Sequence, residues 1–196
     1  WGGRARFSAE LWVSSSLPAP VEGARLRARV LDASGAEVEG VTTTVTLVAD
    51  GSTPLGTIGC PIGRIGTGVF FLDIQLADRD GEPLSTSRMC FSSAVDLVPL
   101  SRLPETRVTA APAGGDGVIL RNEGDQPAVG VRVADGGDVR ASSQLRIADA
   151  CFSLLPGEAR TVRLAGGGGR SVGGDGRRLA ISGINVTLFT ASLDDG

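Results

Sequence analysis

The sequence predicts an all-β protein made of two tandem immunoglobulin-like β-sandwich domains, residues 1–100 and residues 101–196. Short segments in which apolar and polar residues alternate recur at about ten-residue spacing, which is typical of such sandwiches. The 29 glycines and 10 prolines fall between these segments, where turns are needed. A length of 196 residues suits two small domains, and no segment has a convincing helical period.

In the first half, alternation predicts strands with one face turned toward a core. The inward rows are Phe7, Ala9, Leu11 and Val13; Ala24, Leu26, Ala28 and Val30; Val41, Thr43, Val45 and Leu47; and Phe70, Leu72, Ile74 and Leu76. The intervening residues, among them Trp12, Phe71 and Asp73, are expected to face outward. Residues 51–67 are rich in Gly and Pro and predict only a weak strand and a loop. Residues 78–83 predict a hairpin turn, followed by a returning strand at 87–91.

The second half is organised around residues 149–164. Phe152 and Leu154 are two apart, Pro156-Gly157 is a turn dipeptide, and Val162 and Leu164 alternate with polar neighbours. This pattern predicts a strand, a tight turn and a second strand, with the apolar side chains facing one core. Further strands are predicted at 106–110, 118–122, 129–133, 144–148, 179–181 and 184–188. Residues 166–169 and 173–176 predict an exposed glycine-rich loop, and the proline-bracketed residues 96–104 predict the junction between the domains.

Three stretches resemble a known enzyme family. Residues 152–158, Phe-Ser-Leu-Leu-Pro-Gly-Glu, lead into a Thr-Val-Arg strand, as in the last immunoglobulin-like domain of glycoside hydrolase family 2 exo-enzymes of the β-mannosidase and exo-β-glucosaminidase type. Family members usually carry Asp-Asn-Tyr-Phe at the start of this segment, whereas Ala150 and Cys151 replace the Asn and Tyr here. Residues 6–13 and 68–76 are similar to the domain that follows the catalytic barrel, so the resemblance covers both halves.

The resemblance implies that the chain is a non-catalytic C-terminal accessory fragment of an exo-glycosidase that releases terminal β-linked sugars. Its expected partners are the upstream catalytic barrel domain of the same protein and the carbohydrate substrate of the parent enzyme. Glycosidases use two carboxylates, and in this family both lie on a (β/α)8 barrel of about 250 residues. This chain is too short for a barrel, so we expect no catalytic residue in it. Two alternatives stay open: a surface or adhesin-type tandem that binds a protein, and a carbohydrate-binding module.

The composition argues against several other functions. The net charge is −3, and every one of the 19 basic residues is a dispersed arginine, so no nucleic-acid partner is expected. No run approaches the roughly 20 apolar residues of a membrane span, so no membrane partner is expected. The absence of an initiator Met suggests a piece of a longer protein, and the arginine-only usage suggests a bacterial one. Its compartment, cytoplasmic or secreted, stays open.

Neither a cofactor nor a metal is expected. The chain has no His and no Cys-x-x-Cys spacing, which argues against a zinc site. Asp78, Asp80 and Glu82 begin like a calcium loop, but Asp80 directly precedes Gly81, which favours a two-residue Asp-Gly hairpin instead. Cys60, Cys90 and Cys151 are expected to be free thiols, although a bond between Cys60 and Cys90 stays open.

Three further features have both a functional and a structural interpretation. The row Arg25, Arg27 and Arg29 would suit an acidic partner, but an exposed sheet face paired with Glu10 or Glu39 is favoured. Trp1 and Trp12 would suit a sugar platform, but contact between Trp12 and a preceding domain is favoured. The sequon Asn185-Val-Thr187 is expected to be unoccupied because its strand is apolar.

Overall fold

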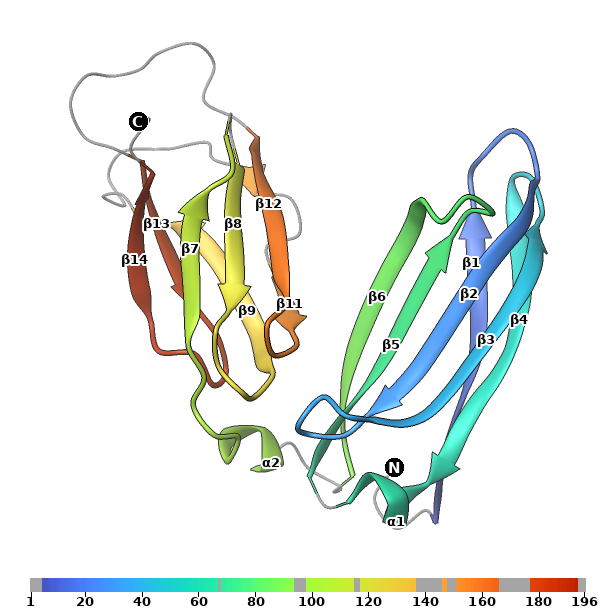
Figure 1. Ribbon diagram of the computed structural model, residues 1–196, viewed down its shortest axis with the longest axis horizontal. Coiled ribbons are helices and arrows are strands. Elements are labelled where there is room, and N and C mark those ends of the chain that lie inside the picture. The colour runs from blue at the N-terminus through green and yellow to red at the C-terminus, as the bar shows by residue number, and fades with distance from the viewer. Residues whose placement is uncertain are drawn as a thin grey trace. The chain divides into compact units, whose positions relative to one another are not determined.

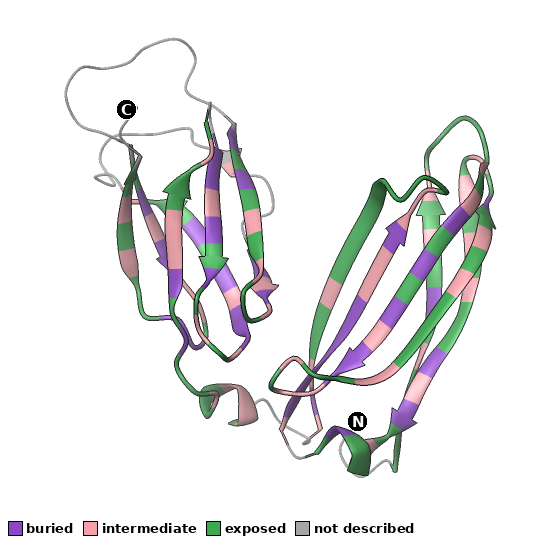
Figure 2. Ribbon diagram, viewed as in Figure 1, coloured by how far each residue is buried: buried purple, intermediate pink, exposed green. Residues whose placement is uncertain are grey.

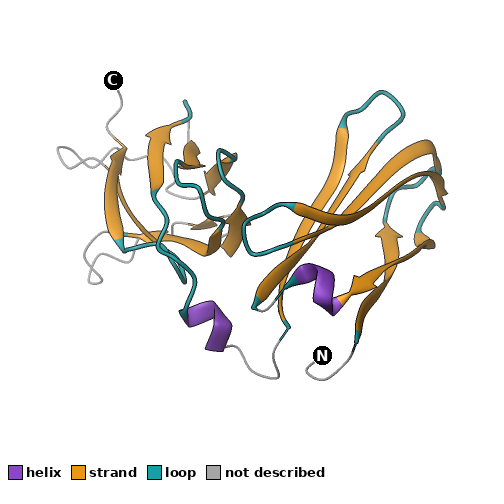
Figure 3. Cartoon of the chain, turned by 60° about the horizontal axis from the view of Figure 1, so that its bottom comes forward, coloured by secondary structure: helices purple, strands orange, loops and turns teal. Residues whose placement is uncertain are grey.

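The computed structural model describes residues 5–66, 68–93, 98–114, 117–136, 146–147, 151–165 and 177–193. These residues form antiparallel strands and two four-residue helices, α1 (Ile62–Ile65) and α2 (Val98–Ser101), as Figure 3 shows. The predicted all-β, immunoglobulin-like sandwich class is therefore confirmed. The chain divides into two compact units, Trp1–Leu100 and Ser101–Gly196. Among the described residues, no helix has the length and apolar character needed to cross a membrane.

The first unit packs a two-stranded sheet against a four-stranded one (Figure 1). In the smaller sheet, β1 (Arg6–Ser15) pairs with β4 (Gly51–Pro61). The larger sheet has the order β3-β2-β5-β6 and is formed by β2 (Val21–Leu31), β3 (Glu37–Leu47), β5 (Val69–Ala77) and β6 (Pro83–Ser92). Neighbouring strands in both sheets are antiparallel, as expected for a sandwich built from short connections.

Three phenylalanine rings join the two sheets of this unit. Phe7 on β1 meets Phe70 on β5 and Phe91 on β6 at centroid distances of 5.0 and 5.4 Å, and Phe70 stacks on Phe91 at 5.3 Å. Around them lie the inward rows of β1, β2 and β5, which the alternation predicted; Figure 2 shows the alternation of buried and exposed residues along β2. The row on β3 was predicted only in part, because Val41 is exposed on this edge strand.

The structure corrects the prediction for residues 51–67. They form β4, which pairs with β1 over nearly its whole length, followed by α1. Gly59 is required here, because a side chain would collide with the backbone carbonyl oxygen of Phe7 on the neighbouring strand. The register also shifts between Leu11 and Trp12, which marks a β-bulge. In this segment, glycine therefore allows two strands to approach closely and accompanies a β-bulge. It does not mark a loop.

A second correction concerns the outer face of β5. Phe71 and Asp73 were expected outside, and both lie on the face opposite the core, yet both are buried. β5 is a central strand of its sheet, and Phe71 stands beside Leu31 of β2, which is also fully buried. Strand register sets Phe71 between Leu31 of β2 and Cys90 of β6, and alternation within one strand does not reveal such neighbours.

The second unit pairs two four-stranded sheets. One has the order β10-β12-β8-β7 and the other β11-β9-β13-β14. The strands are β7 (Val108–Pro112), β8 (Gly117–Asn122), β9 (Ala128–Asp135), β10 (Arg146–Ile147), β11 (Cys151–Leu154), β12 (Ala159–Ala165), β13 (Arg177–Ser182) and β14 (Phe189–Leu193). Their buried side chains form one apolar core between the sheets.

The turn after β11 has the geometry that Pro-Gly predicts. The Glu158 N–H donates to the Leu155 carbonyl at 3.0 Å, and Gly157 has a φ of 74°, as the third position of a type II turn requires. The Glu158 carboxylate accepts the Leu155 N–H at 2.7 Å. Phe152, Leu154, Val162 and Leu164 all face the core as predicted. The turn crosses between sheets, however, since β11 and β12 belong to different ones.

The strand predicted at 184–188 is wrong. These residues form an irregular segment, and the final strand β14 begins only at Phe189. Asn185 explains the difference, because its buried side chain bonds to the backbone of other segments in place of a sheet ladder. The glycine-rich loop at 166–169 and 173–176 lies outside the described residues, as do residues 94–97 of the predicted junction.

Candidate functional site

The most concentrated group of charged side chains lies on the outer face of the four-stranded sheet in the first unit. Strand register places Arg29 of β2 beside Asp73 of β5, and Asp73 beside Arg88 of β6. Residues that lie directly opposite each other on neighbouring strands point to the same face of the sheet. These three side chains therefore form a row across three strands. The next row contains Arg27 and Gln75.

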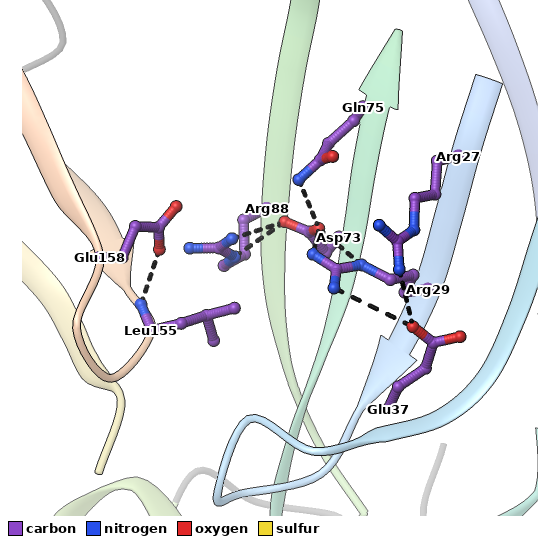
Figure 4. A network of polar contacts seen from close by, with 8 residues as sticks. All are labelled: Arg27, Arg29, Glu37, Asp73, Gln75, Arg88, Leu155 and Glu158. Carbon is purple, nitrogen blue, oxygen red and sulfur yellow. Dashed lines mark hydrogen bonds and ion pairs between the residues drawn. The ribbon is translucent and has the colours of Figure 1, made fainter. Parts of the chain in front are cut away.

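Asp73 is the centre of this group, as Figure 4 shows. One carboxylate oxygen, Oδ2, accepts Nη2 and Nε of Arg29 at 2.6 and 3.2 Å and Nε2 of Gln75 at 3.2 Å. The other, Oδ1, accepts Nε of Arg88 at 2.9 Å and lies 2.7 Å from its Nη2. Asp73 is only 3% exposed, so two guanidinium groups compensate for the loss of water around its charge.

Arg27 and Glu37 extend the group toward β3. Glu37 Oε2 lies 3.3 Å from Nη2 of Arg27 and 4.0 Å from Nη1 of Arg29. The Arg27 side chain is 53% exposed, so the ion pair between Arg27 and Glu37 is open to solvent and weak. The ion pairs of Asp73 are shorter and shielded from solvent. A hollow of about 410 Å³ opens here and is lined by Arg27, Arg29, Glu37, Gly40, Val41 and Thr42.

Arg27 and Arg29 of the β2 row are therefore paired within their own sheet face, as the favoured interpretation expected, but with different carboxylates. Arg29 binds Asp73 and Arg27 binds Glu37, whereas Glu39 pairs with Arg64 at 2.7 Å. Asp73 was missed as a partner. The signal that could have found it is the register, which sets Arg29 directly across from Asp73 once β2 and β5 are paired.

Trp12 faces outward from β1, as predicted, and is 60% exposed. It stands across from Pro54 of β4, next to the bulge. Glu10 and Ser14 lie on the same face of β1, where Ser14 shares a hydrogen bond with Ser52. The face around this indole carries small and polar side chains. Trp1, the other aromatic candidate, lies outside the described residues.

The three cysteines are free. Cys60 points into the core of the first unit, while Cys90 lies on the outer face of β6, beside Phe71, so the backbone of the larger sheet separates the two thiols. The Cys60–Cys90 bond that the sequence left open does not form. Burial raises the pKa of the Cys60 thiol, and desolvation raises that of Cys90 to about 11, although part of the latter residue is exposed. High thiol pKa values disfavour nucleophilic reactivity.

The acidic segment 78–82 is a turn, but not the two-residue hairpin that was predicted. Five residues separate β5 from β6, and Asp78 Oδ1 accepts the N–H groups of Asp80 and Glu82 at 2.9 and 2.8 Å. The Asp78 carboxylate thus caps its own loop. In the part of the chain that the structure describes, no three Cys, Asp or Glu side chains come together in a way that could hold a metal ion.

Two buried asparagines in the second unit escaped the sequence analysis as structural centres. Asn185, the sequon residue, accepts the Val129 N–H at 2.9 Å and donates to the carbonyls of Pro104 and Pro127, both at 2.9 Å. Its amide is fully engaged and buried, which leaves no room for a glycan and agrees with the expectation. Asn122 is similar and is fully buried. A polar residue in a strand pattern gives no sign of such a role until its neighbours are known.

Comparison with known proteins finds a family match within the first unit and structural similarity over most of the chain. Residues 8–94 match the family model described as Mannosidase Ig/CBM-like domain. The exo-chitosanase CsxA of Amycolatopsis orientalis is similar with a TM-score of 0.75 and 21% identity over 94% of this chain and 25% of the enzyme. A β-D-mannosidase of Dictyoglomus thermophilum is similar with a TM-score of 0.61 and 14% identity over 93% of this chain and 22% of the enzyme. Comparison with curated protein sequences finds no match.

The predicted resemblance is therefore confirmed for residues 8–94, which match a Mannosidase Ig/CBM-like domain. The family match supports it for residues 8–94, and the structural similarities extend the shared fold over 94% of the chain. The chain spans about a quarter of the length of these enzymes.

Proposed function

We propose that this chain is the non-catalytic C-terminal accessory part of a glycoside hydrolase family 2 exo-glycosidase, and that it supports a catalytic barrel in the same protein. The observation that carries the proposal is the match of residues 8–94 to a Mannosidase Ig/CBM-like domain. The parent enzyme would release terminal β-linked sugars, and the similar proteins, an exo-chitosanase and a β-mannosidase, suggest two candidate activities.

The chemistry of the described side chains agrees with a supporting role. Glycosidases need a pair of carboxyl groups facing each other across a cleft, with one free to donate a proton. The most buried carboxylate, Asp73, is instead held by two arginines, and Asp78 caps its own turn. Both carboxylates are committed to structure.

Trp12 supplies a candidate contact with the rest of the parent protein. It is a large apolar side chain on an outer face, and such side chains are favoured at the centre of protein interfaces. We propose that the outer face of β1 and β4 around Trp12 packs against another domain of the parent.

The proposal is tested by adding the chain to a separately produced catalytic barrel of its parent enzyme. The isolated chain should hydrolyse neither 4-nitrophenyl β-D-glucosaminide nor 4-nitrophenyl β-D-mannoside. The barrel should be active, and its thermal inactivation should slow when the chain is added. Trp12→Ala should weaken this protection, whereas the matched outward substitution Ser8→Ala should not. Turnover by the isolated chain would overturn the non-catalytic role, and a barrel whose stability and activity ignore the chain would overturn the supporting role.

Carbohydrate binding is a second candidate, favoured by the exposed indole of Trp12. An aromatic face can stack on a sugar ring, although only one such side chain is exposed on β1. Binding to a glycan array that disappears in Trp12→Ala would favour this function over domain contact.

A further inference from the structure

We propose that Arg27 and Arg29, together with Gly40 and Thr42, form a binding site for the carboxylate group of a small ligand. The site is the hollow of about 410 Å³ on the outer face of β2 and β3. It is distinct from the Trp12 face, which lies on the other sheet, and the proposed accessory role does not depend on it.

The hollow exists because β3 has a glycine opposite Arg29. Gly40 pairs with Arg29 across the strands and lines the hollow without a side chain of its own. A side chain at position 40 would collide with the carboxylate of Glu37, so that carboxylate lies over Gly40. Thr42, across from Arg27, adds a hydroxyl group to the rim. Guanidinium groups bind carboxylates through paired N–H donors, and a hydroxyl suits a neighbouring polar atom of the ligand.

Glu37 occupies the place that the ligand carboxylate would take. Its Oε2 atom is 3.3 Å from Arg27 and 4.0 Å from Arg29, whereas the Arg29–Asp73 pair is at 2.6 Å. The Glu37 side chain is also 44% exposed. Long distances and exposure make such a contact worth at most about 1 kcal/mol, so a ligand carboxylate can displace it. The side chain of Glu37 is then an internal competitor for the site.

The local charge favours an anion. Two guanidinium groups, those of Arg27 and Arg29, line the hollow, and one carboxylate, that of Glu37, lines it with them. Asp73 already uses Nε and Nη2 of Arg29, which leaves Nη1 directed toward Glu37. The acidic turn at 78–82 follows Ala77, which pairs with Arg25 and not with Arg27. A carboxylate in the hollow would therefore meet more positive than negative charge.

The ligand group that the hollow would bind is a carboxylate, and either a simple carboxylic acid or an acidic sugar can supply it. Both are tested by titrating the ¹⁵N-labelled 196-residue chain with sodium acetate, sodium glucuronate or glucose at constant ionic strength, and by following the Arg27 and Arg29 Nε–H signals. We expect the signals to move with glucuronate and acetate and not with glucose or with sodium chloride. Equal affinity for acetate and glucuronate would identify a carboxylate site without sugar contacts, and tighter glucuronate binding would identify an acidic sugar site.

Three variants make the test specific. Glu37→Gln removes the internal competitor and should tighten binding about 5-fold, the equivalent of the 1 kcal/mol limit for an exposed pair. Arg27→Gln should abolish saturable binding. Arg25→Gln is the matched control, because it removes the same charge from the same face but does not line the hollow. Thermal unfolding of each variant checks that it is folded. Unchanged affinity in Glu37→Gln, equal losses in Arg27→Gln and Arg25→Gln, or shifts reproduced by sodium chloride would overturn the proposal.

Discussion

Arg29 and Asp73 meet at 2.6 Å on the outer face of a central strand pair, where the carboxylate is nearly inaccessible to solvent. Arg88 approaches the same carboxylate from the other side at 2.7 Å. The three residues come from β2, β5 and β6, so one anion links three neighbouring strands. Buried ion groups contribute little over an apolar alternative, but removing one member leaves uncompensated charge, which is costly.

We expect Asp73→Ala to lower the free energy of unfolding by about 3 kcal/mol, because it removes the buried carboxylate that two largely buried guanidinium groups share. Urea denaturation of the chain measures this change. Asp80→Ala is a suitable control, since Asp80 forms an exposed pair with Arg79 at 3.6 Å and should change stability by less than about 0.5 kcal/mol. Similar effects of the two substitutions would contradict the central role of Asp73.

The triple substitution Asp73→Leu, Arg29→Met and Arg88→Met provides a sharper comparison. It replaces Asp73 and the two arginines that bind its carboxylate with apolar side chains, so all three of these charges are removed together. We expect a smaller loss than for Asp73→Ala alone, as found for buried ion groups in general. If the triple variant is much less stable than Asp73→Ala, the ion group stabilises the fold by more than an apolar replacement does, and this expectation is wrong.

The phenylalanine cluster should be the most sensitive apolar part of the first unit. Phe70 is fully buried and contacts Phe7 and Phe91, so Phe70→Ala removes two ring contacts and opens a cavity. The expected loss is about 3–5 kcal/mol in urea denaturation. Trp12→Ala removes an exposed side chain of larger size and should have a much smaller effect on the isolated chain. Equal losses would mean that Trp12 is packed within the unit.

Asn122 should have a comparable role in the second unit. Its Oδ1 accepts the Thr106 hydroxyl and the Gly124 N–H at 3.0 and 3.1 Å, and its Nδ2 donates to the Gln126 and Leu154 carbonyls at 2.7 and 3.1 Å. Asn122→Ala leaves buried backbone groups unsatisfied, and we expect a loss of about 2–4 kcal/mol. Asn122→Asp keeps the shape, but a carboxylate cannot donate to the Gln126 and Leu154 carbonyls, so this variant should also be strongly destabilised.

The exposed neighbour Glu123 provides the control for both Asn122 variants, because its carboxylate lies 4.0 Å from Arg121 and accepts a long hydrogen bond of 3.5 Å from the Thr109 hydroxyl. Glu123→Ala should change stability by less than about 0.5 kcal/mol. If Asn122→Asp unfolds at the same urea concentration as the unmodified chain, the donor role of the amide is refuted.

Alternation predicted the strands that have one face in a core and the other in solvent. The rows of Phe7 on β1 and Leu26 on β2 are such cases, because a period of two reports a half-buried strand directly. The Pro156-Gly157 turn was also predictable, because few residue pairs suit its backbone angles. That it connects two different sheets was not predictable, since local geometry does not say which strand pairs with which.

The failures have one physical cause, which is that the deciding contacts are distant in sequence. Gly59 is a strand residue because of the carbonyl of Phe7, and Asn185 interrupts a strand because of Pro104, Pro127 and Val129. The candidate site shows the same limit. The arginines of β2 were visible as a row, but their partner Asp73 is 44 positions from Arg29 and becomes evident only when β2 and β5 are aligned.

Desolvation around Cys90 leads to a prediction about pH. Its pKa is raised to about 11, so at pH 8 roughly one thiol in a thousand is ionised, compared with about one in ten for a thiol at the ordinary value of 9.0. Because the thiolate is the reactive form, alkylation of Cys90 by iodoacetamide should be slow and should rise about tenfold per pH unit from pH 8 to pH 10. Peptide mapping by mass spectrometry resolves Cys90 from the other two thiols.

The sign of the linked stability effect follows from the same shift. The folded chain holds the Cys90 proton more tightly than the unfolded chain does, so this contribution to stability is complete below pH 9 and is lost as the pH rises toward about 11. The control for the alkylation is the chain in concentrated urea, where the rate at Cys90 should level off near pH 9. A plateau at the same pH in the folded chain, with circular dichroism showing that it remains folded, would contradict the raised pKa.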